Sequence, residues 1–327
     1  MTEAQVLLSI RGLKTYFHTD KGVVRAVDNV SYRVDKDEIL AVVGESGSGK
    51  SVTALSIMRL VQSPPGFHAG GEIRFRGEDL VQKSKKEMRA LRGCAIGMIF
   101  QDPMSSLNPA YTVGQQLTEA LRVHGNVSKK EARDRVLEMM HLVRVPAASQ
   151  RINDYPFQLS GGLRQRVMIA MALVCKPALL IADEPTTALD VTIQAQILEL
   201  MMRLRDETGS AIILITHDLG VVAETAERVV VMYAGWEMEV VPVDKLFTDP
   251  AHPYTYALLK SIPRLDATDK RLAVIPGNIP SLSDLPTGCR FHPRCEFKTD
   301  RCSEEEPELE GLSEGRWVRC WHPLSRG

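Results

Sequence analysis

A glycine-rich octapeptide has the composition of a phosphate-binding loop. Residues 44–51 match the pattern G-x-x-x-x-G-K-[ST], which holds nucleotide phosphates when it lies between a strand and a helix. Its glycines let backbone N–H groups turn towards a β-phosphate, and the following helix adds the positive end of its dipole. We expect Lys50 to reach the β- and γ-phosphates and the Ser51 hydroxyl to ligate Mg²⁺. The loop residues predicted to contact a nucleotide are Gly44, Ser46, Gly47, Ser48, Gly49, Lys50 and Ser51.

A second chemical element is a pair of carboxylates at the end of an apolar run. Leu179–Ala182 has the character of a buried strand, and Asp183 and Glu184 follow it directly. The first carboxylate of such a pair can bind Mg²⁺, and the second can face an attacking water. Asp183 is therefore the predicted magnesium ligand, and Glu184 is the predicted general base of nucleotide hydrolysis.

These residues require an α/β core to position them. Glu38–Val43 is a compact apolar strand, and it is separated by the glycine-rich loop from a helical pattern at Ser51–Val61. Leu179–Ala182 and Ala211–Ile215 are two further buried strands, with the amphipathic segment Ile193–Arg205 between them. Alternation of this kind predicts a parallel sheet flanked by helices.

Other segments predict additions to this core. Val6–Val34 contains short β-prone runs punctuated by Gly, Asp and Asn, which predict antiparallel strands near an edge. Residues 103–176 favour helix with almost no strand signal and predict a helical subdomain inserted into the core. Prolines and short turns become frequent after Gly235, so we place a boundary near 236–250. We expect one domain over 1–245 and a small loop-dominated C-terminal module over 246–327.

Composition limits the class of partner. The 327 residues are 44% hydrophobic, which suffices for a core, and 40 Lys and Arg nearly balance 41 Asp and Glu. No global positive field attracts the chain to nucleic acid or anionic lipid. The longest apolar run, Val167–Cys175, has nine residues, whereas a membrane-spanning helix needs about 20. The N-terminus lacks the features of a secretory signal, and a cytoplasmic location is expected.

The six cysteines fall into two groups. Cys94 and Cys175 lie among apolar residues and are expected to be core side chains. The other four crowd into the last 39 residues with the spacing C-x5-C-x6-C-x17-C, and they are Cys289, Cys295, Cys302 and Cys320. Disulfides do not persist in a reducing compartment, so a metal ion or cluster is the leading candidate for these four thiols.

One further motif resembles a known family. Leu159–Arg166 is similar to the LSGGQ signature of the ATP-binding-cassette (ABC) ATPases, with Leu163 at the fifth position. We expect Ser160 to N-cap a helix running to about Cys175, whose N-terminus with two glycines lets an anion approach closely. The resemblance implies that this motif contacts the γ-phosphate of ATP held by the opposite subunit, and so implies a dimer. The motif residues expected at this phosphate are Ser160, Gly161 and Gly162.

The resemblance extends to other elements in the family's order. Gln101 is similar to the residue that senses Mg²⁺ and the attacking water, and Asp190 to the one that reaches across the dimer. His217 follows a core strand and resembles the histidine that contacts the γ-phosphate. Tyr16 resembles the aromatic residue that stacks on adenine, with Phe17 as the neighbouring alternative. The fold implied is a P-loop NTPase ABC cassette with a RecA-like parallel sheet, an antiparallel β subdomain and a helical insertion.

Two segments are similar to the oligopeptide and dipeptide importer branch of this family, namely Met98–Pro109 and Ala251–Leu259. The resemblance implies a second ATPase subunit of a different chain, two transmembrane permease subunits and an extracytoplasmic peptide-binding protein, at the cytoplasmic face of the membrane. Some members of the branch carry a 4Fe-4S cluster on a similar cysteine set. Four thiolates also suit Zn²⁺, although the paired C-x2-C spacing usual for zinc is missing. Gly235–Pro242 departs from the branch, since relatives tend to have a basic residue and a glycine-containing turn there.

Three alternatives remain open from sequence. A soluble ABC ATPase acting on nucleic acid or ribosomes would share the cassette residues. An importer of a metal chelate or glutathione would share the whole chain, because other subunits select the cargo. In a third alternative, the cysteine cluster senses redox state and ATP hydrolysis is secondary.

Overall fold

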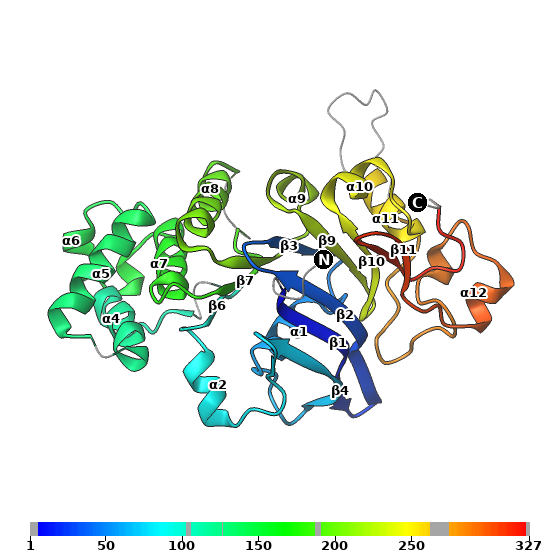
Figure 1. Ribbon diagram of the computed structural model, residues 1–327, viewed down its shortest axis with the longest axis horizontal. Helices are drawn as coiled ribbons and strands as arrows, with labels where there is room; N and C mark the ends of the chain where they lie inside the picture. The colour runs from blue at the N-terminus through cyan, green and yellow to red at the C-terminus, as the bar shows by residue number, and fades with distance from the viewer. Residues whose placement is uncertain (1–5, 103–105, 126, 187–190, 262–274, 325–327) are drawn as a thin grey trace. The chain divides into compact units, whose positions relative to one another are not determined.

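The computed structural model describes residues 6–102, 106–125, 127–186, 191–261 and 275–324 (Figure 1). The chain divides into two compact units. The first comprises Met1–Val34, Ile39–Val81 and Thr216–Gly327, and the second comprises Asp35–Glu38 and Gln82–Ile215. Of the helices that the structure describes, none combines the length and the apolar character needed to cross a bilayer.

The first unit contains the antiparallel sheet predicted for the N-terminal segment. Its strand order is β2-β1-β4-β5, where β1 is Val6–Thr19, β2 is Gly22–Asp35, β4 is Gly66–Phe75 and β5 is Glu78–Asp79. β1 pairs antiparallel with β4, and alternate β1 residues such as Leu8 and Ile10 are buried. The short runs seen in the sequence are therefore long strands in which one face is buried.

A second set of strands in the first unit carries the phosphate loop. β3 (Ile39–Val43) is completely buried and pairs parallel with β9 (Arg228–Tyr233). β9 pairs antiparallel with β10 (Trp236–Pro242), and β10 pairs antiparallel with β12 (Arg316–Val318), which pairs with β11 (Glu310–Ser313). The helices of this unit are α1 (Lys50–Ile57), α9 (Leu219–Thr225), α10 (Val243–Thr248), α11 (Pro253–Lys260), η3 (His292–Arg294) and α12 (Asp300–Glu304).

Strand β10 lies in the segment that departs from the importer branch, and it contains two buried glutamates. Glu237 and Glu239 are completely buried and form ion pairs with Arg319 (3.0 Å) and Arg316 (3.5 Å) of the C-terminal segment. The Glu239 carboxylate also accepts the backbone N–H groups of Ala251 and His252, both at 2.9 Å, just before α11. The C-terminal segment is thus less loop-dominated than predicted, since β11 and β12 extend the sheet next to β10.

The second unit contains three parallel strands and most of the helices. β6 (Ile96–Ile99), β7 (Leu179–Asp183) and β8 (Ala211–Ile215) pair in that order, and all their residues are buried. The segment predicted to be helical contains α4 (Val113–His124), α5 (Lys129–Leu142), α6 (Ala148–Arg151), η2 (Pro156–Gln158) and α7 (Gly161–Leu173), grouped together in Figure 1. The unit also has α2 (Lys85–Leu91) and α8 (Val191–Thr208).

Candidate active site

The phosphate loop joins β3 to α1 in the first unit and is closed by internal hydrogen bonds. The Lys50 ammonium is buried and donates to the carbonyl oxygens of Gly44 at 2.8 Å and Glu45 at 2.9 Å. The Ser48 carbonyl accepts the N–H of Gly235, at the turn between β9 and β10, at 2.9 Å. The lysine is therefore folded back over its own loop, where the phosphates of a nucleotide can replace the carbonyl groups as its partners.

Two glycines of this loop are required by the fold itself. Gly44 and Gly49 have φ values of +147° and +103°, which side chains rarely adopt. A Cβ atom at Gly49 would lie 2.5 Å from the Ala26 carbonyl oxygen, and one at Gly44 would collide with the Met232 carbonyl oxygen. The backbone of the phosphate loop can take this course only with glycine at both positions.

Tyr16, the predicted adenine-stacking residue, lies half-buried on β1. Its hydroxyl donates to Asp28 at 2.5 Å, and its ring meets the Phe67 ring edge-on at 6.0 Å between centroids. Burial and the bond to Asp28 raise the pKa of Tyr16 to about 12. Phe17, the neighbouring alternative, packs against Gly66 of β4, so it has a structural role in this sheet. Adenine stacking by Tyr16 stays a prediction.

His217 lies just before α9 in the first unit. Its side chain is exposed on the loop after β8, and the next residue, Asp218, N-caps α9 through the N–H groups of Gly220 (2.9 Å) and Val221 (3.2 Å). This cap fixes the backbone beside the histidine. The contact of His217 with a γ-phosphate stays a prediction.

In the second unit the structure joins two predicted catalytic residues. The Gln101 side chain, just after β6, donates from Nε2 to the Glu184 carboxylate at 2.9 Å. Asp183 is the buried last residue of β7, and the Glu184 N–H donates to the Ile215 carbonyl at 3.0 Å. Glu184 has φ +46°, a conformation that few non-glycine residues adopt. The strand ends sharply at this residue, and the amide of Gln101 orients its carboxylate.

The signature segment begins helix α7, as predicted. Ser160 occupies the N-cap position, but its side chain makes no capping hydrogen bond, so that part of the expectation is corrected. A Cβ atom at Gly161 would meet nothing within 4 Å, and one at Gly162 would meet only the Ile193 methyl group at 3.7 Å. The fold of this chain does not require glycine at either position, whereas close approach by a molecule outside the chain would.

The last two residues of the signature segment connect it to other parts of the second unit. Gln165 donates from its side chain to the Pro185 carbonyl, next to Glu184. Arg166 donates to the Val143 carbonyl at 2.9 Å and to the Gln196 side chain at 2.7 Å. Local sequence patterns do not predict these contacts, because the partners lie 20 to 30 residues away along the chain. Asp190, the remaining predicted residue near this segment, lies outside the described residues.

The four C-terminal cysteines line one small cavity, together with aromatic and histidine side chains. Burial raises the pKa of Cys289 to about 11 and that of Cys320 to about 12, and the His322 N–H, 3.4 Å from Cys320 Sγ, only partly offsets the effect. Within the described ranges, no group of three or more His, Cys, Asp or Glu side chains is arranged to hold a metal ion. The metal or cluster therefore stays a prediction.

Comparison with known proteins agrees with this geometry. The ABC transporter family matches residues 27–187, and the C-terminal region of oligopeptide/dipeptide transporters matches residues 238–302. The oligopeptide transport ATP-binding protein AppD of Bacillus subtilis is 52% identical over 96% of both chains. The dipeptide transport ATP-binding protein DppD of Escherichia coli is 49% identical over 97% of both chains.

Solved structures show the same fold. An ATP-binding cassette solved as a dimer in a post-hydrolysis state, bound to ADP and Pi, has a TM-score of 0.65 and 28% identity. It covers 72% of this chain and 98% of its own. The chain belongs to the ABC transporter family, and its fold is that of an ATP-binding cassette. Its C-terminal region places it, within that family, among the ATP-binding proteins of the oligopeptide and dipeptide transporters.

Proposed function

We propose that this chain is the ATP-hydrolysing subunit of an importer that carries dipeptides or oligopeptides across the cytoplasmic membrane. The observation that carries the proposal is the match over nearly the whole chain, at 49–52% identity, to relatives named for dipeptide and oligopeptide transport. The match includes the C-terminal region as well as the cassette. The chain lies, in this proposal, on the cytoplasmic face of the membrane as a peripheral subunit.

The nucleotide chemistry follows from the residue types. Lys50 and the loop N–H groups bind the phosphates, His217 contacts the γ-phosphate, and Tyr16 stacks on adenine. Hydroxyl, carboxylate and amide oxygens are hard ligands that suit Mg²⁺, and here they come from Ser51, Asp183 and Gln101. Magnesium, when bound, neutralises charge that develops on the phosphate oxygens.

Proton removal is assigned to Glu184. Its carboxylate is fixed by the hydrogen bond from Gln101, so little reorganisation is needed before it accepts a proton from water. Gln101 thus has two roles, since it orients the base and starts the segment that leads into the helical insertion. Phosphoryl transfer needs mainly positioning and charge neutralisation, which these side chains supply.

The assembly follows from the signature segment. Ser160, Gly161 and Gly162 close the nucleotide site of a second ATPase subunit, and Asp190 reaches across the same dimer. We propose that this second subunit is a different chain. Residues 1–245 form the ATPase domain, whose helical subdomain at about 103–176 transmits closure to two permease subunits. Residues 246–327 form the C-terminal module, and an extracytoplasmic peptide-binding protein delivers the cargo.

Affinity purification of the tagged chain from detergent-solubilised membranes tests this assembly. We expect two multi-span permeases and a second ATPase to co-purify, as mass spectrometry would identify, because the signature segment needs a partner site. A peptide-binding protein in the same preparation would support import. Recovery of the chain with ribosomes or nucleic acid and without permeases would overturn the proposal.

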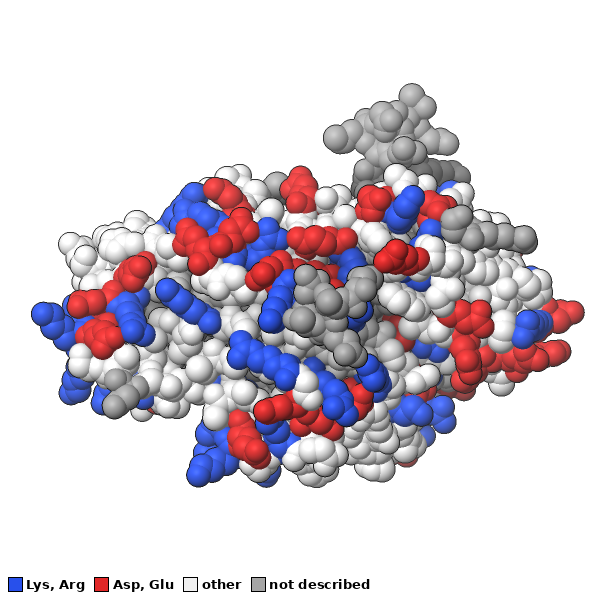
Figure 2. Space-filling view, viewed as in Figure 1, with Lys and Arg blue, Asp and Glu red and all other residues white. Residues whose placement is uncertain are grey.

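The charges on the face shown in Figure 2 do not favour the nucleic-acid alternative. Lys and Arg are interspersed with Asp and Glu on the face shown in Figure 2, and the formal net charge is −1. Binding to a phosphate backbone depends on a concentrated basic surface. Importers of other cargo, such as a metal chelate or glutathione, differ in their binding proteins, and the peptide names of the relatives favour peptides.

A second proposal concerns the four cysteines. We propose that Cys289, Cys295, Cys302 and Cys320 hold a 4Fe-4S cluster, with Zn²⁺ as the alternative occupant. Support comes from the one cavity that all four line and from backbone N–H groups near three of the thiols, those of Phe291 at Cys289, Phe297 at Cys295 and His322 at Cys320. Four thiolates and such N–H donors are what a cluster needs. It would crosslink a segment poor in regular structure.

Anaerobic purification tests the cluster directly. We expect about four iron and four sulfide per chain, both lost in the Cys302→Ser variant. Cys94→Ser is the matched control, because that thiol lies outside the cavity and its removal should change neither. One zinc per chain without iron would establish the alternative. The absence of both iron and zinc would overturn the proposal.

A further inference from the structure

The loop between Cys289 and Cys295 reaches the phosphate loop of the same unit. Arg294 is 5% exposed, and its NH1 group donates to both oxygens of the Glu45 carboxylate, at 3.0 and 3.2 Å. Glu45 is the second residue of the phosphate loop. This partly buried ion pair therefore joins the C-terminal segment to the segment predicted to hold ATP phosphates.

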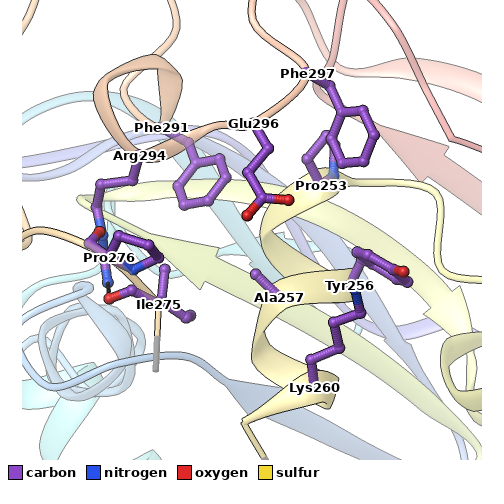
Figure 3. A pocket seen from close by; sticks show the side chains of 10 residues that line it. All are labelled: Pro253, Tyr256, Ala257, Lys260, Ile275, Pro276, Phe291, Arg294, Glu296 and Phe297. Carbon is purple, nitrogen blue, oxygen red and sulfur yellow. Dashed lines mark hydrogen bonds between the residues drawn. The ribbon is translucent and has the colours of Figure 1, made fainter. Parts of the chain in front are cut away.

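The Arg294 side chain is itself held by hydrogen bonds to two backbone carbonyl groups. Its Nε donates to the Pro276 carbonyl at 2.9 Å and its NH2 to the Ile275 carbonyl at 3.3 Å, so the guanidinium has little freedom (Figure 3). NH1 also donates to the Tyr233 hydroxyl at 3.2 Å. A planar guanidinium with several fixed donors orients a carboxylate more strictly than a flexible ammonium does.

Glu45 is held through its backbone as well. Its N–H donates to the hydroxyl of Tyr254 on α11 at 3.0 Å, and its carbonyl accepts from Lys50 at 2.9 Å. The Tyr254 ring packs against Tyr233 (4.7 Å between centroids) and Phe291 (5.3 Å), the latter in the cysteine loop. The residue that holds the phosphate-binding lysine is therefore fixed at both its side chain and its N–H by the C-terminal segment.

The same loop reaches the predicted adenine-binding residue. Arg290 is 2% exposed and forms an ion pair with Asp28 of β2, which also accepts the Tyr16 hydroxyl at 2.5 Å. Arg290 lies over the Trp236 ring at 4.0 Å from its centroid and donates to the Ala234 carbonyl. The Arg290 guanidinium is thereby fixed beside Asp28, the residue that accepts the Tyr16 hydroxyl.

We infer that the loop Cys289–Cys295 and helix α11 position the nucleotide site of their own chain. Arg294 of the loop and Tyr254 of α11 fix Glu45, and Arg290 of the loop fixes Asp28 and thus Tyr16. The inference rests on the proposed function, because it takes Lys50 and Tyr16 to bind ATP. A phosphate loop fixed before binding loses less conformational freedom when the nucleotide arrives, which raises affinity. The C-terminal region then sets the affinity for ATP.

The test is a double-mutant cycle on ATP affinity. Arg294→Gln, Glu45→Gln and the double variant of the full chain are titrated with a fluorescent ATP analogue. If Arg294 acts by positioning Glu45, each single variant weakens binding by about tenfold and the double variant is no weaker than either. Arg294→Lys should restore affinity in part, because it keeps the charge without the fork of donors.

A general effect of charge on the phosphates predicts a different pattern. Loss of the arginine would weaken binding, loss of the glutamate would strengthen it, and the effects would multiply in the double variant. That pattern, or unchanged affinity in Arg294→Gln, would overturn the inference. An unmodified chain that does not bind ATP would overturn the proposed function instead.

A milder pair of variants covers the case in which Arg294→Gln fails to fold. Tyr254→Phe removes only the hydroxyl that accepts the Glu45 N–H, and we expect about threefold weaker binding, the loss of one ordinary hydrogen bond. Tyr256→Phe, two residues away on the same helix, is the matched control and should bind as the unmodified chain does. Equal affinities of the two variants would count against the inference.

Discussion

Replacement of Glu184 by Gln is expected to lower ATP turnover of the assembled transporter by about 10³-fold, the range assigned to loss of a general base. In the unmodified chain, Gln101 Nε2 lies 2.9 Å from the Glu184 carboxylate. The introduced amide would keep the size of the side chain and an oxygen that can accept the hydrogen bond from Gln101. It cannot accept a proton from water at neutral pH. Binding of ATP should therefore be unchanged, because the phosphate loop is untouched.

Steady-state phosphate release and equilibrium binding of a fluorescent ATP analogue measure these two quantities separately. Glu224→Gln is the matched control, since it removes an exposed carboxylate on α9 and should leave turnover as it is. Turnover retained in Glu184→Gln would show that another group, or water alone, removes the proton.

The second large effect is expected at Gly161. An aspartate there should reduce turnover of the assembled transporter more than about 100-fold, because the added carboxylate would face the γ-phosphate held by the partner ATPase. The fold should tolerate it, since a Cβ at Gly161 meets nothing within 4 Å of this chain. ATP binding by the isolated chain should also be unchanged.

Thermal unfolding, nucleotide binding and phosphate release together test this prediction. Leu163→Gln is the control in the same motif, because it changes a side chain and adds no charge, and it should retain most of the activity. Normal turnover in Gly161→Asp would remove the signature segment from the partner's nucleotide site. A loss of folding in the isolated chain would show instead that Gly161 serves this chain's own structure.

Local sequence patterns were sufficient for the strands of the core and for the place of the glycine-rich loop between β3 and α1. β8 was predicted with its observed ends, Ala211–Ile215, and β3 and β7 to within one residue, because continuous apolar runs bounded by turns define buried parallel strands. The phosphate loop was recognisable because its backbone conformation requires glycine at fixed positions. Gln101 and Glu184 were predicted as site residues from two separate motifs, and the structure shows that their side chains are hydrogen-bonded to each other.

Long-range pairs of charges could not be predicted in the same way. Glu237 and Glu239 interrupt the apolar pattern of β10, and only arginines about 80 residues later explain how they are buried. Arg294 and Glu45 are 249 residues apart, and neither carries a local signal of the other. Such contacts depend on tertiary structure, and for this reason the sequence suggested only a loop-dominated C-terminal module.

ATP-driven peptide uptake by the purified complex in proteoliposomes is the most direct measurement of the proposed function. We expect a labelled peptide to accumulate inside vesicles when ATP is supplied on the side of this chain, and peptide with its binding protein to stimulate phosphate release. Both should disappear in Glu184→Gln. ATP hydrolysis that is indifferent to peptide and permeases, with no accumulation in the vesicles, would contradict the account.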